Sequence, residues 1–364
     1  MTTYTGDDAR MVNQFLEMVR IDSESGEEQA MMEYLLKAIP AQGGTAEQDT
    51  YGNLIARFPA KGCEGAEPVL LSCHADTVKP GKGIEPVIGD DGVIRSAGDT
   101  ILGADDKAGI AEVLDALRIA AVYPPVEFAV SRQEEVGLFG VKNMDFSKLT
   151  ARRGFLMDND TLDTIVVGGP SYFAIDVSIK GRSAHAGMEP EKGVNAIQAA
   201  AKAIASLRLG RLDHETTANV GVIEGGMIRN GVPDRASFLA ECRSGIHEKG
   251  QALADEMVAT IREQATANGA EVEVTVNNLC KAVTIPEDAW CVKTAQAALR
   301  TIGVDAKPVF ITGFTDASIY NNEGIQMAVV GIGAKDEHAT TEHVAIADMS
   351  RARDALVEML RLSV

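Results

Sequence analysis

The sequence lacks any apolar run of roughly 18 residues, the length that a membrane-spanning helix needs. Its first residues, MTTYTGDDAR, also lack the basic stretch and following apolar segment of an export signal. Low-complexity tracts and repeats of fixed period are absent as well, which excludes a solenoid or a propeller. We therefore predict no membrane partner and no conventional export.

Basic residues are scarce relative to acidic ones. The 34 lysines and arginines are outnumbered by 53 aspartates and glutamates, which gives a formal net charge of −19. An acidic surface repels polyanions, so we predict no nucleic-acid partner. Carboxylates that gather in one place would instead attract divalent cations, although most of these side chains are expected on solvated helix faces.

Paired cysteines are lacking too. The five cysteines are an odd number, lie far apart in the sequence and form no CxxC pair. This pattern indicates reduced thiols, and hence a cytoplasmic location.

The sequence does contain enough apolar material for large cores. Of its 364 residues, 45% are hydrophobic, and a prior of about 150 residues per domain predicts two or three domains. In the first part of the chain, short apolar strands alternate with helical patterns, which is typical of a buried, mostly parallel sheet. We predict helices over residues 8–20, 25–38 and 108–121, and strands over residues 53–58, 69–73 and 126–131.

The pattern changes near residue 172. The next predicted elements are strand, helix, strand, strand, helix and strand, over residues 173–179, 194–207, 219–224, 237–244, 251–267 and 271–276. This βαββαβ order is typical of a small ferredoxin-like domain. The first pattern then resumes, with helices over residues 286–302 and 347–361 and strands over residues 308–311 and 327–331. We therefore predict an α/β core domain over residues 1–170 and 281–364, interrupted by an inserted domain over residues 171–280.

Five short segments concentrate side chains that bind metals, and four of them follow a predicted core strand, where binding sites form in open α/β sheets. In the first, HADT, His74 and Asp76 are two apart in an extended segment, so they share a face while Cys73 points away. Asp76 is placed to accept the second N–H of a metal-bound His74. Taken alone, this pair is equally compatible with an ordinary surface pair.

The second and third segments hold adjacent acidic residues. In GADDKAG, Asp105 and Asp106 open a predicted helix, where an aspartate ordinarily caps the free N–H groups. Two aspartates exceed what a cap needs, and one of them could bridge two cations. In EEVG, Glu134 and Glu135 follow a strand and point in opposite directions. One of them could therefore bind a metal while the other moves a proton.

The fourth and fifth segments complete a set of ligands. Asp158 follows the strand-like residues 154–157, and the segment DEHATTE holds His338 and Glu342. Together the five segments supply His, Asp, Glu, Asp and His from the ends of one sheet. Carboxylates with imidazoles suit zinc, cobalt or manganese. Two such ions sharing a carboxylate form a hydrolytic centre, and a spare glutamate completes it by deprotonating water.

These motifs resemble those of the dinuclear zinc exopeptidases. The resemblance rests on HADT, GADDKAG, EEVG and the late His-x-x-x-Glu around an inserted βαββαβ domain, and it covers essentially the whole chain. The superfamily includes peptidase T, glutamate carboxypeptidase, the aminoacylases and succinyl-diaminopimelate desuccinylase. GADDKAG and the single Asp158 look most like the peptidase T (tripeptide aminopeptidase) branch.

The resemblance implies a role for each residue of the first segments. His74 would bind one metal ion and Asp76 would orient it, while Asp105 would bridge the two ions. Family members often have a cis peptide bond after this bridging aspartate. Glu134 would be the general base, and Glu135 would bind one of the ions.

The resemblance assigns the two remaining ligands as well. Asp158 would bind the ion that Glu135 does not. The final histidine could be His338 or His343, and the family pattern of a glutamate four residues after the ligand selects His338, with Glu342. We expect His343 on the surface of the following segment.

The inserted domain resembles the family's lid, which often forms dimers. His185, in GRSAHAG, would help to stabilise the developing oxyanion, in its own site or in that of a neighbouring subunit; the alternative is an ordinary turn histidine. Asn230 and Arg243 match positions that hold substrate in relatives. An arginine suits the free carboxylate of a short peptide, because its guanidinium can bind both oxygens.

We therefore predict a cytoplasmic hydrolase with two divalent metal ions that removes the N-terminal residue of short peptides, tripeptides favoured. Zinc is the expected metal, with cobalt and manganese as alternatives, and a homodimer through the lid is the expected assembly. One alternative is the same chemistry on another amide, as in an aminoacylase, a deacetylase or a carboxypeptidase. The other is a metal-binding protein that has lost catalysis.

Overall fold

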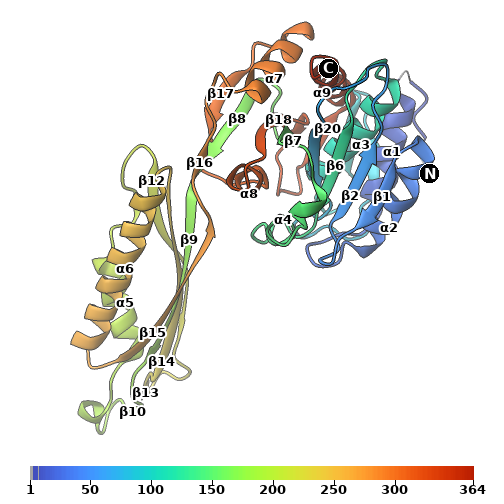
Figure 1. Cartoon of the computed structure of the whole chain (residues 1–364). Helices are drawn as coiled ribbons and strands as arrows, with labels where there is room; N and C mark the ends of the chain where they lie inside the picture. Colours follow the sequence, from blue (N-terminus) through green and yellow to red (C-terminus); the bar gives the residue numbers. More distant parts are fainter. Residues whose placement is uncertain (1–2, 7) are drawn as a thin grey trace. The chain divides into compact units, whose positions relative to one another are not determined.

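A computed structural model describes residues 3–6 and 8–364 of the chain, which divides into two compact units. Unit 1 runs to Gly168 and resumes over Thr284–Phe310 and Thr315–Val364. Unit 2 comprises Gly169–Val283 and the short segment Ile311–Phe314. Figure 1 shows the ribbon of each unit with its elements labelled.

Unit 1 is built on a nine-stranded mixed sheet with the order β1-β2-β6-β3-β7-β18-β8-β16, with β17 beside β8. Its four central strands, β6, β3, β7 and β18, run parallel, whereas β1, β2 and β8 pair antiparallel at the two sides. The strands are β1 (Thr45–Gln48), β2 (Leu54–Phe58), β3 (Val69–His74), β6 (Val126–Ser131), β7 (Arg153–Asn159), β8 (Thr164–Gly169), β16 (Val283–Thr284), β17 (Lys307–Phe310) and β18 (Gln326–Gly331).

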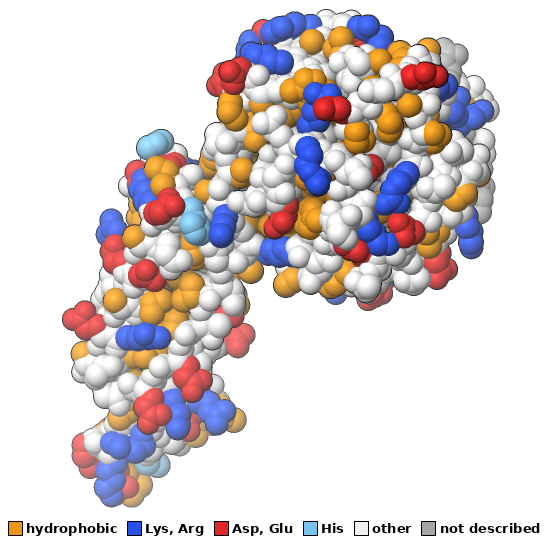
Figure 2. Space-filling model, in the orientation of Figure 1, with side chains coloured by type: hydrophobic (Ala, Val, Ile, Leu, Met, Phe, Trp, Pro, Cys, Tyr) orange, Lys and Arg blue, Asp and Glu red, His pale blue; other side chains and the backbone are white. Residues whose placement is uncertain are grey.

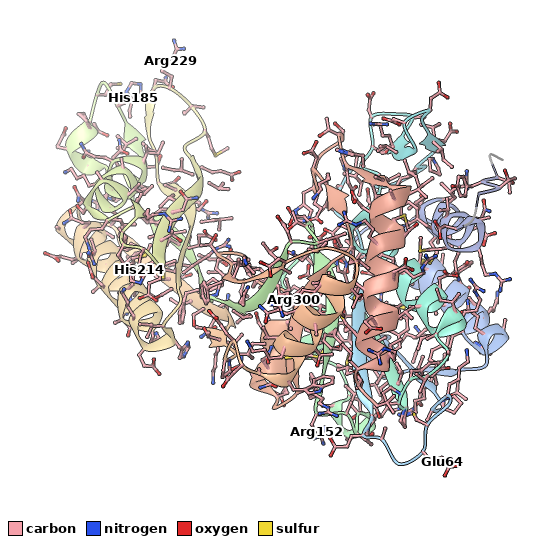
Figure 3. The ribbon with its side chains drawn as sticks, turned by 90° about the horizontal axis from the view of Figure 1, so that it is seen from above. Glu64, Arg152, His185, His214, Arg229 and Arg300 are labelled. Atoms are coloured by element: carbon pink, nitrogen blue, oxygen red, sulfur yellow. The ribbon has the colours of Figure 1, made fainter. Side chains whose placement is uncertain are left out.

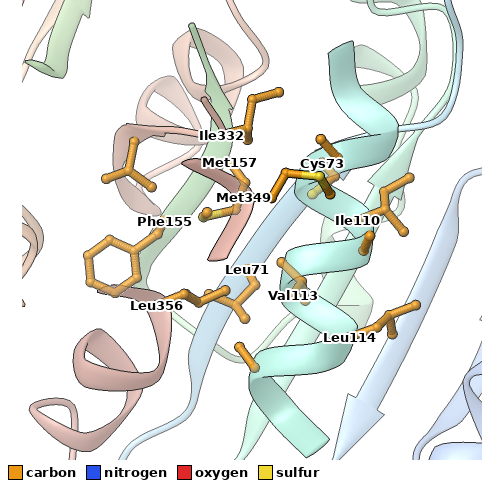
Figure 4. Packing of buried hydrophobic residues seen from close by; sticks show 14 of the residues in the cluster. Leu71, Cys73, Ile110, Val113, Leu114, Phe155, Met157, Ile332, Met349 and Leu356 are labelled. Carbon is orange, nitrogen blue, oxygen red and sulfur yellow. The ribbon is translucent and has the colours of Figure 1, made fainter. Parts of the chain in front are cut away.

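The central strands are apolar throughout because both of their faces are covered. Every residue of β3 and of β6 is buried, as expected for parallel strands between helical layers. Among the helices, α1 packs on α3, α3 on α9, and α9 on α7. Figure 4 shows the core where Leu71 of β3, Val113 of α3 and Leu356 of α9 meet. The helices are α1 (Ala9–Val19), α2 (Gln29–Ala38), α3 (Ala104–Ile119), α4 (Phe139–Lys142), α7 (Trp290–Thr301), α8 (Ala317–Asn322) and α9 (Ile346–Arg361).

A smaller sheet of four short strands also belongs to unit 1, in the order β19-β20-β5-β4. It joins the chain before α3 to the chain before α9, because β5 pairs antiparallel with β20. The strands are β4 (Pro86–Ile88), β5 (Val93–Ser96), β19 (Ala334–Lys335) and β20 (His343–Ala345).

Unit 2 is an antiparallel sheet, β11-β12-β14-β9-β15, with α5 and α6 packed together on one of its faces. Buried and less buried residues alternate along β14, as one covered face and one open face require. The elements are β9 (Ser171–Lys180), β10 (Ala184–His185), α5 (Ala196–Ser206), β11 (Gly210–Arg211), β12 (Thr216–Gly225), β13 (Gly231–Val232), β14 (Arg235–Ser244), α6 (His247–Ala267) and β15 (Glu271–Cys280).

The predicted fold class is confirmed. Unit 2 has the βαββαβ order as β9, α5, β12, β14, α6 and β15, and the centre of the large sheet is parallel as expected. The strands at its sides are antiparallel, a difference that the order of strands in the sequence did not predict. Figure 2 shows acidic and basic side chains interspersed over the visible face of each unit. Within the described ranges, no helix is long and apolar enough to span a membrane.

Candidate active site

Three neighbouring parallel strands of unit 1 end at the same edge of the sheet and carry the first candidate residues. His74 is the last residue of β3, Asp158 lies near the end of β7, and Glu134 follows β6. The register pairs His74 with Ser131, the last residue of β6. Ligand sites form at the carboxyl ends of such strands, so the fold brings these side chains together.

Asp105 reaches this edge from the irregular start of α3. Asp105 and Asp106 have non-helical backbone angles, and the peptide bond between them is cis, as the resemblance implied. The Glu342 carboxylate holds this segment by accepting the peptide N–H groups of Leu102 and Gly103 at Oε2, 2.8 and 2.7 Å away, and that of Asp105 at Oε1, 3.0 Å away. Glu342 therefore fixes the backbone that presents Asp105.

The two oxygens of Asp105 face two different histidines. His74 Nε2 lies 3.0 Å from Asp105 Oδ1, and His338 Nε2 lies 3.2 Å from Oδ2. Beyond them, His74 Nε2 is 3.7 Å from Asp158 Oδ1, and His338 Nε2 is 3.0 Å from Glu135 Oε1. His343 instead lies on β20, with Nδ1 3.0 Å from the carbonyl oxygen of Thr341.

These side chains form sets that could each hold a metal ion. One set is His74, Asp105 and Asp158, another is Asp105, Glu135 and His338, and the possible ligand atoms of each lie within 4.8 Å of one another. Asp105 belongs to both. Asp158 Oδ2 is buried and has no hydrogen-bond partner among the described residues, which leaves a carboxylate oxygen available for a cation. The donors are imidazole nitrogens and carboxylate oxygens, a combination that zinc and its neighbours accept.

The electrostatics of the cluster also favour added positive charge. Burial raises the pKa of Glu134 well above its usual range, and the nearby Asp158 raises it further. Burial likewise raises the pKa of Glu135 to about 7. Hydrogen bonds to Asp105 and Glu135 raise the pKa of His338 to about 10. Buried carboxylates at this density repel one another, and cations relieve that repulsion.

Asp76 contacts His74 and also the backbone of both glutamates. Nδ1 of His74 lies 3.0 Å from the Asp76 carbonyl oxygen and 3.5 Å from its carboxylate, so the nearer acceptor is the carbonyl. The Asp76 carboxylate accepts the peptide N–H groups of Glu134 and Glu135, 2.9 and 3.2 Å away. Asp76 thus positions both the histidine and the two glutamates.

Sequence reasoning missed Asp316 as a member of the site. Its side chain is fully buried, Ser131 Oγ donates a hydrogen bond to Oδ2, and Oδ1 has no partner within the described chain. Burial raises the pKa of Asp316 to about 7. The sequence offers no local signal for Asp316, because its partner Ser131 lies 185 positions earlier in the chain.

The three predicted residues of unit 2 lie at two different places. His185 of β10 pairs with Gly231 of β13, and the carbonyl of Asn230 accepts the N–H of Ala186, so His185 and Asn230 are neighbours. Figure 3 shows His185 near Arg229 at one end of unit 2. Arg243 lies at the other end of β14, paired with Tyr172. Arg235 begins β14 and lies eight residues before Arg243, which is roughly 26 Å at about 3.3 Å per residue, and Asn230 lies before the start of that strand.

Arg243 sits in an aromatic setting on the open face of the sheet. Its guanidinium carbon lies 4.5 Å from the centre of the Tyr172 ring, which stacks on Phe314 with 5.3 Å between ring centres. Nη1 donates to the carbonyl of Thr312, 3.0 Å away, and Nη2 to Glu241, 2.9 Å away. Arg243 Nε has no partner among the residues that the structure describes.

Comparison with known proteins identifies the family. Residues 171–268 match the peptidase dimerisation domain. An uncharacterised protein of Bacillus subtilis, YqjE, is 34% identical over 96% of this chain and 97% of its own length. Two crystal structures superimpose closely: the aminopeptidase PepT of Bacillus cereus (35% identity, 98% and 99% coverage, TM-score 0.89) and a tripeptidase of Staphylococcus aureus (34%, 98% and 98%, TM-score 0.93).

Fold, dimerisation domain and full-length similarity together define an exopeptidase of the M20 type. The chain belongs to the M20 peptidase family, in its peptidase T-like group.

Proposed function

We propose that the chain is a metal-dependent aminopeptidase that removes the N-terminal residue of short peptides, with tripeptides favoured. The observation that carries this proposal is the Asp105 carboxylate, which lies between two histidines with Glu134 close by. The aminopeptidase and the tripeptidase among the similar structures support the substrate class.

Two divalent cations are the proposed cofactors, zinc first, with cobalt and manganese as alternatives. His74 and Asp158 would hold one ion, Glu135 and His338 the other, and Asp105 would contact both. The shared position of Asp105 in two ligand sets and the free oxygen of Asp158 support this arrangement.

Glu134 is the proposed general base. A pair of cations held at this site would supply Lewis acidity to the scissile carbonyl and lower the pKa of water. Glu134 takes a proton from the attacking water and delivers it to the leaving amine. His185 would donate a hydrogen bond to the carbonyl oxygen as negative charge develops there.

The spacing within unit 2 supports a homodimer that shares residues between sites. An extended tripeptide spans about 10 Å, so it cannot touch both Asn230 and Arg243 of one chain. We therefore propose that His185 and Asn230 act in the site of the partner subunit. The match to a dimerisation domain supports this assembly, as do Val222 and Leu239, which are paired and exposed on the open face of the sheet.

A cytoplasmic location remains part of the proposal. The five described cysteines form no disulfide with one another, and four of them are buried, which is compatible with a reducing compartment. Fractionation of the native cells would test the proposal, because recovery of the protein outside the cytoplasm would contradict it.

The test of the proposed function uses protein reconstituted with zinc, cobalt or manganese. A mixture of di-, tri- and tetrapeptides, their N-acetylated forms and N-acyl amino acids is incubated with it, and products are identified by mass spectrometry. We expect loss of the N-terminal residue from free peptides, fastest for tripeptides. Cleavage of only the blocked or acylated substrates would overturn the aminopeptidase assignment. If no substrate were cleaved with any metal, the proposal of a metal-dependent peptidase would be overturned.

A further inference from the structure

The turn that carries Glu134 and Glu135 contains a strained residue. Gln133 has φ +52°, a left-handed conformation that a residue with a Cβ adopts at a cost and keeps only when its surroundings enforce it. The question is therefore which side chains hold this turn.

Glu28 provides the main support. Its side chain is fully buried, at 0% exposure. Oε1 accepts the N–H groups of Gly26, 2.6 Å away, and of the strained Gln133, 3.2 Å away. Oε2 accepts both Nε and Nη2 of Arg132, at 2.9 and 2.7 Å. One carboxylate thus fixes the backbone and the side chain of the two residues that precede Glu134.

The same segment supports the turn from a second side. Ser25 Oγ donates to Asp76 Oδ2, 2.7 Å away, and the Asp76 carboxylate accepts the N–H groups of Glu134 and Glu135. Residues 25–28 therefore support the turn through two carboxylates. The Glu28 carboxylate contacts the residues before Glu134, and the Asp76 carboxylate, which Ser25 holds, accepts the N–H groups of Glu134 and Glu135.

We propose that Glu28 is a positioning residue for hydrolysis: it holds Gln133 in the left-handed conformation and so aims the carboxylate of Glu134, the next residue. This inference rests on the proposed role of Glu134 as the general base. The hydrogen bonds of Glu28 go to Gly26, Arg132 and Gln133, so it acts on Glu134 through the backbone.

The first test is Glu28→Gln in the metal-loaded full-length protein. An amide at this position must place an NH2 group either against the Arg132 guanidinium or against the N–H groups of Gly26 and Gln133, so one set of contacts is lost in either orientation. We expect kcat to fall about 10- to 100-fold, with KM within twofold and metal content per chain unchanged. Wild-type kcat, or a loss of metal that parallels the loss of kcat, would overturn the proposal.

A matched control is Glu27→Gln. Glu27 is the neighbouring residue, is exposed and pairs with Lys82 at the surface, 2.7 Å away. We expect its kcat to equal that of the wild type, and a loss equal to that of Glu28→Gln would overturn a specific role for Glu28.

The second test is rescue at the strained residue. Glycine adopts φ +52° without a Cβ penalty, so Gln133→Gly added to Glu28→Gln should raise kcat at least fivefold. Gln133→Ala in the same background removes the same side chain but keeps the Cβ, and should give no rescue. Equal effects of the two substitutions would overturn the strained turn as the route of action.

Thermal unfolding of every variant accompanies these assays. Should Glu28→Gln fail to fold, Arg132→Lys takes its place, because it keeps the charge but loses the paired N–H contacts of the guanidinium to Glu28. We then expect a five- to tenfold lower kcat at unchanged KM, and an unchanged kcat would overturn the proposal. A wild-type protein that hydrolyses no peptide would instead overturn the proposed function, which separates the two failures.

Discussion

Glu134 and Glu135 are adjacent in the sequence yet meet different surroundings. The Glu135 carboxylate contacts His338, 3.0 Å away. The pKa of Glu134 is instead raised mainly by burial and by the nearby Asp158 carboxylate. The contact of Glu135 with an imidazole suits metal binding, which leaves Glu134 as the candidate for proton transfer. The turn after β6 thus gives different surroundings to two residues that the residue type alone leaves equal.

Replacing Glu134 by Gln should abolish turnover without disturbing the ligands. Because the amide cannot accept the proton of water, we expect kcat to fall by about 100- to 10,000-fold, with two metal ions still bound per chain. Steady-state kinetics with metal analysis checks this. A variant that retains more than a tenth of wild-type kcat would contradict the assignment of the base.

Glu112, on α3, is a buried carboxyl group that the proposed reaction does not use. Its side chain is fully buried, and neither carboxylate oxygen has a partner in the described part of the chain. Burial, reinforced by Asp106, raises the pKa of Glu112 well above its usual range. The folded protein therefore binds this proton more tightly than the unfolded chain.

This difference predicts a specific pH dependence of stability. The stabilisation from the Glu112 proton is fully present below the unfolded pKa, near 4.5, and is lost as the pH rises through the raised folded pKa. The loss amounts to about 1.4 kcal/mol per pH unit in that window. The glutamine of Glu112→Gln cannot titrate, so the free energy of unfolding of this variant should rise relative to that of the wild type from pH 5 to pH 8.

Urea unfolding at each pH measures this gain. Glu33→Gln, an exposed substitution on α2, serves as the control and should stay parallel to the wild type. A constant difference between Glu112→Gln and the wild type across the pH range would refute the prediction.

The sequence predicted the residues of the cluster that lie at strand ends, because a strand pattern followed by His or Asp is visible locally. It could not predict Glu28 or Asp316. Arg132 lies 104 positions after Glu28 and Ser131 lies 185 positions before Asp316, so only the folded chain joins these pairs. For Asp76, the pattern indicated the right neighbourhood but not which of its oxygens lies nearer to the imidazole.

Among the elements, β3 and β7 show how closely the strands that carry ligands approach. Gly154 of β7 pairs with Leu70 of β3, and a Cβ at Gly154 would lie 1.9 Å from the Leu70 carbonyl oxygen. Since the atoms that this Cβ would meet all belong to the Leu70 backbone, no side chain can move aside to make room. The absence of a side chain at this position lets the two strands hold His74 and Asp158 at one edge.

Gly154→Ala should therefore force the two strands apart. We expect a loss of about 3 kcal/mol in the free energy of unfolding, typical of overpacking in a rigid core, and a lower affinity for one metal ion. Gly98→Ala is the control, since its added Cβ would meet nothing within 4 Å. Urea unfolding and metal titration check both variants, and equal stabilities would count against the prediction.

Element prediction succeeded where periodicity is strong. The predicted helix over residues 347–361 is α9, Ile346–Arg361, and the predicted strand over residues 126–131 is β6. Short strands such as β4 and β20 carry only three residues each, too few for an alternation to show. The helix predicted over residues 108–121 begins earlier, at Ala104, because the irregular Asp105 and Asp106 precede its regular turns.

For the whole molecule, the proposed exchange of His185 between subunits makes a quantitative prediction. Coexpression of His185→Ala with Glu134→Gln gives mixed dimers in which one site has an intact Glu134 and an intact His185 from its partner. Random pairing makes half of the dimers mixed, so we expect about a quarter of wild-type activity. Each variant alone should be nearly inactive.

Purification through two different tags isolates the mixed dimers, for which we expect half of the wild-type activity because one of their two sites is intact. If His185 acted in its own chain's site, both sites of a mixed dimer would be defective and no activity would return. A protein that is monomeric by light scattering would likewise contradict the exchange.

The short segment Ile311–Phe314 belongs by its contacts to unit 2, although the chain on both sides of it belongs to unit 1. The Phe314 ring stacks on Tyr172, and Thr312 accepts a hydrogen bond from Arg243. The inserted domain is therefore not a detachable module. A shortened chain that closed Gly168 directly onto Thr284 would leave an orphaned aromatic ring two residues before Asp316, so domain swaps within this family must exchange Ile311–Phe314 together with the insertion.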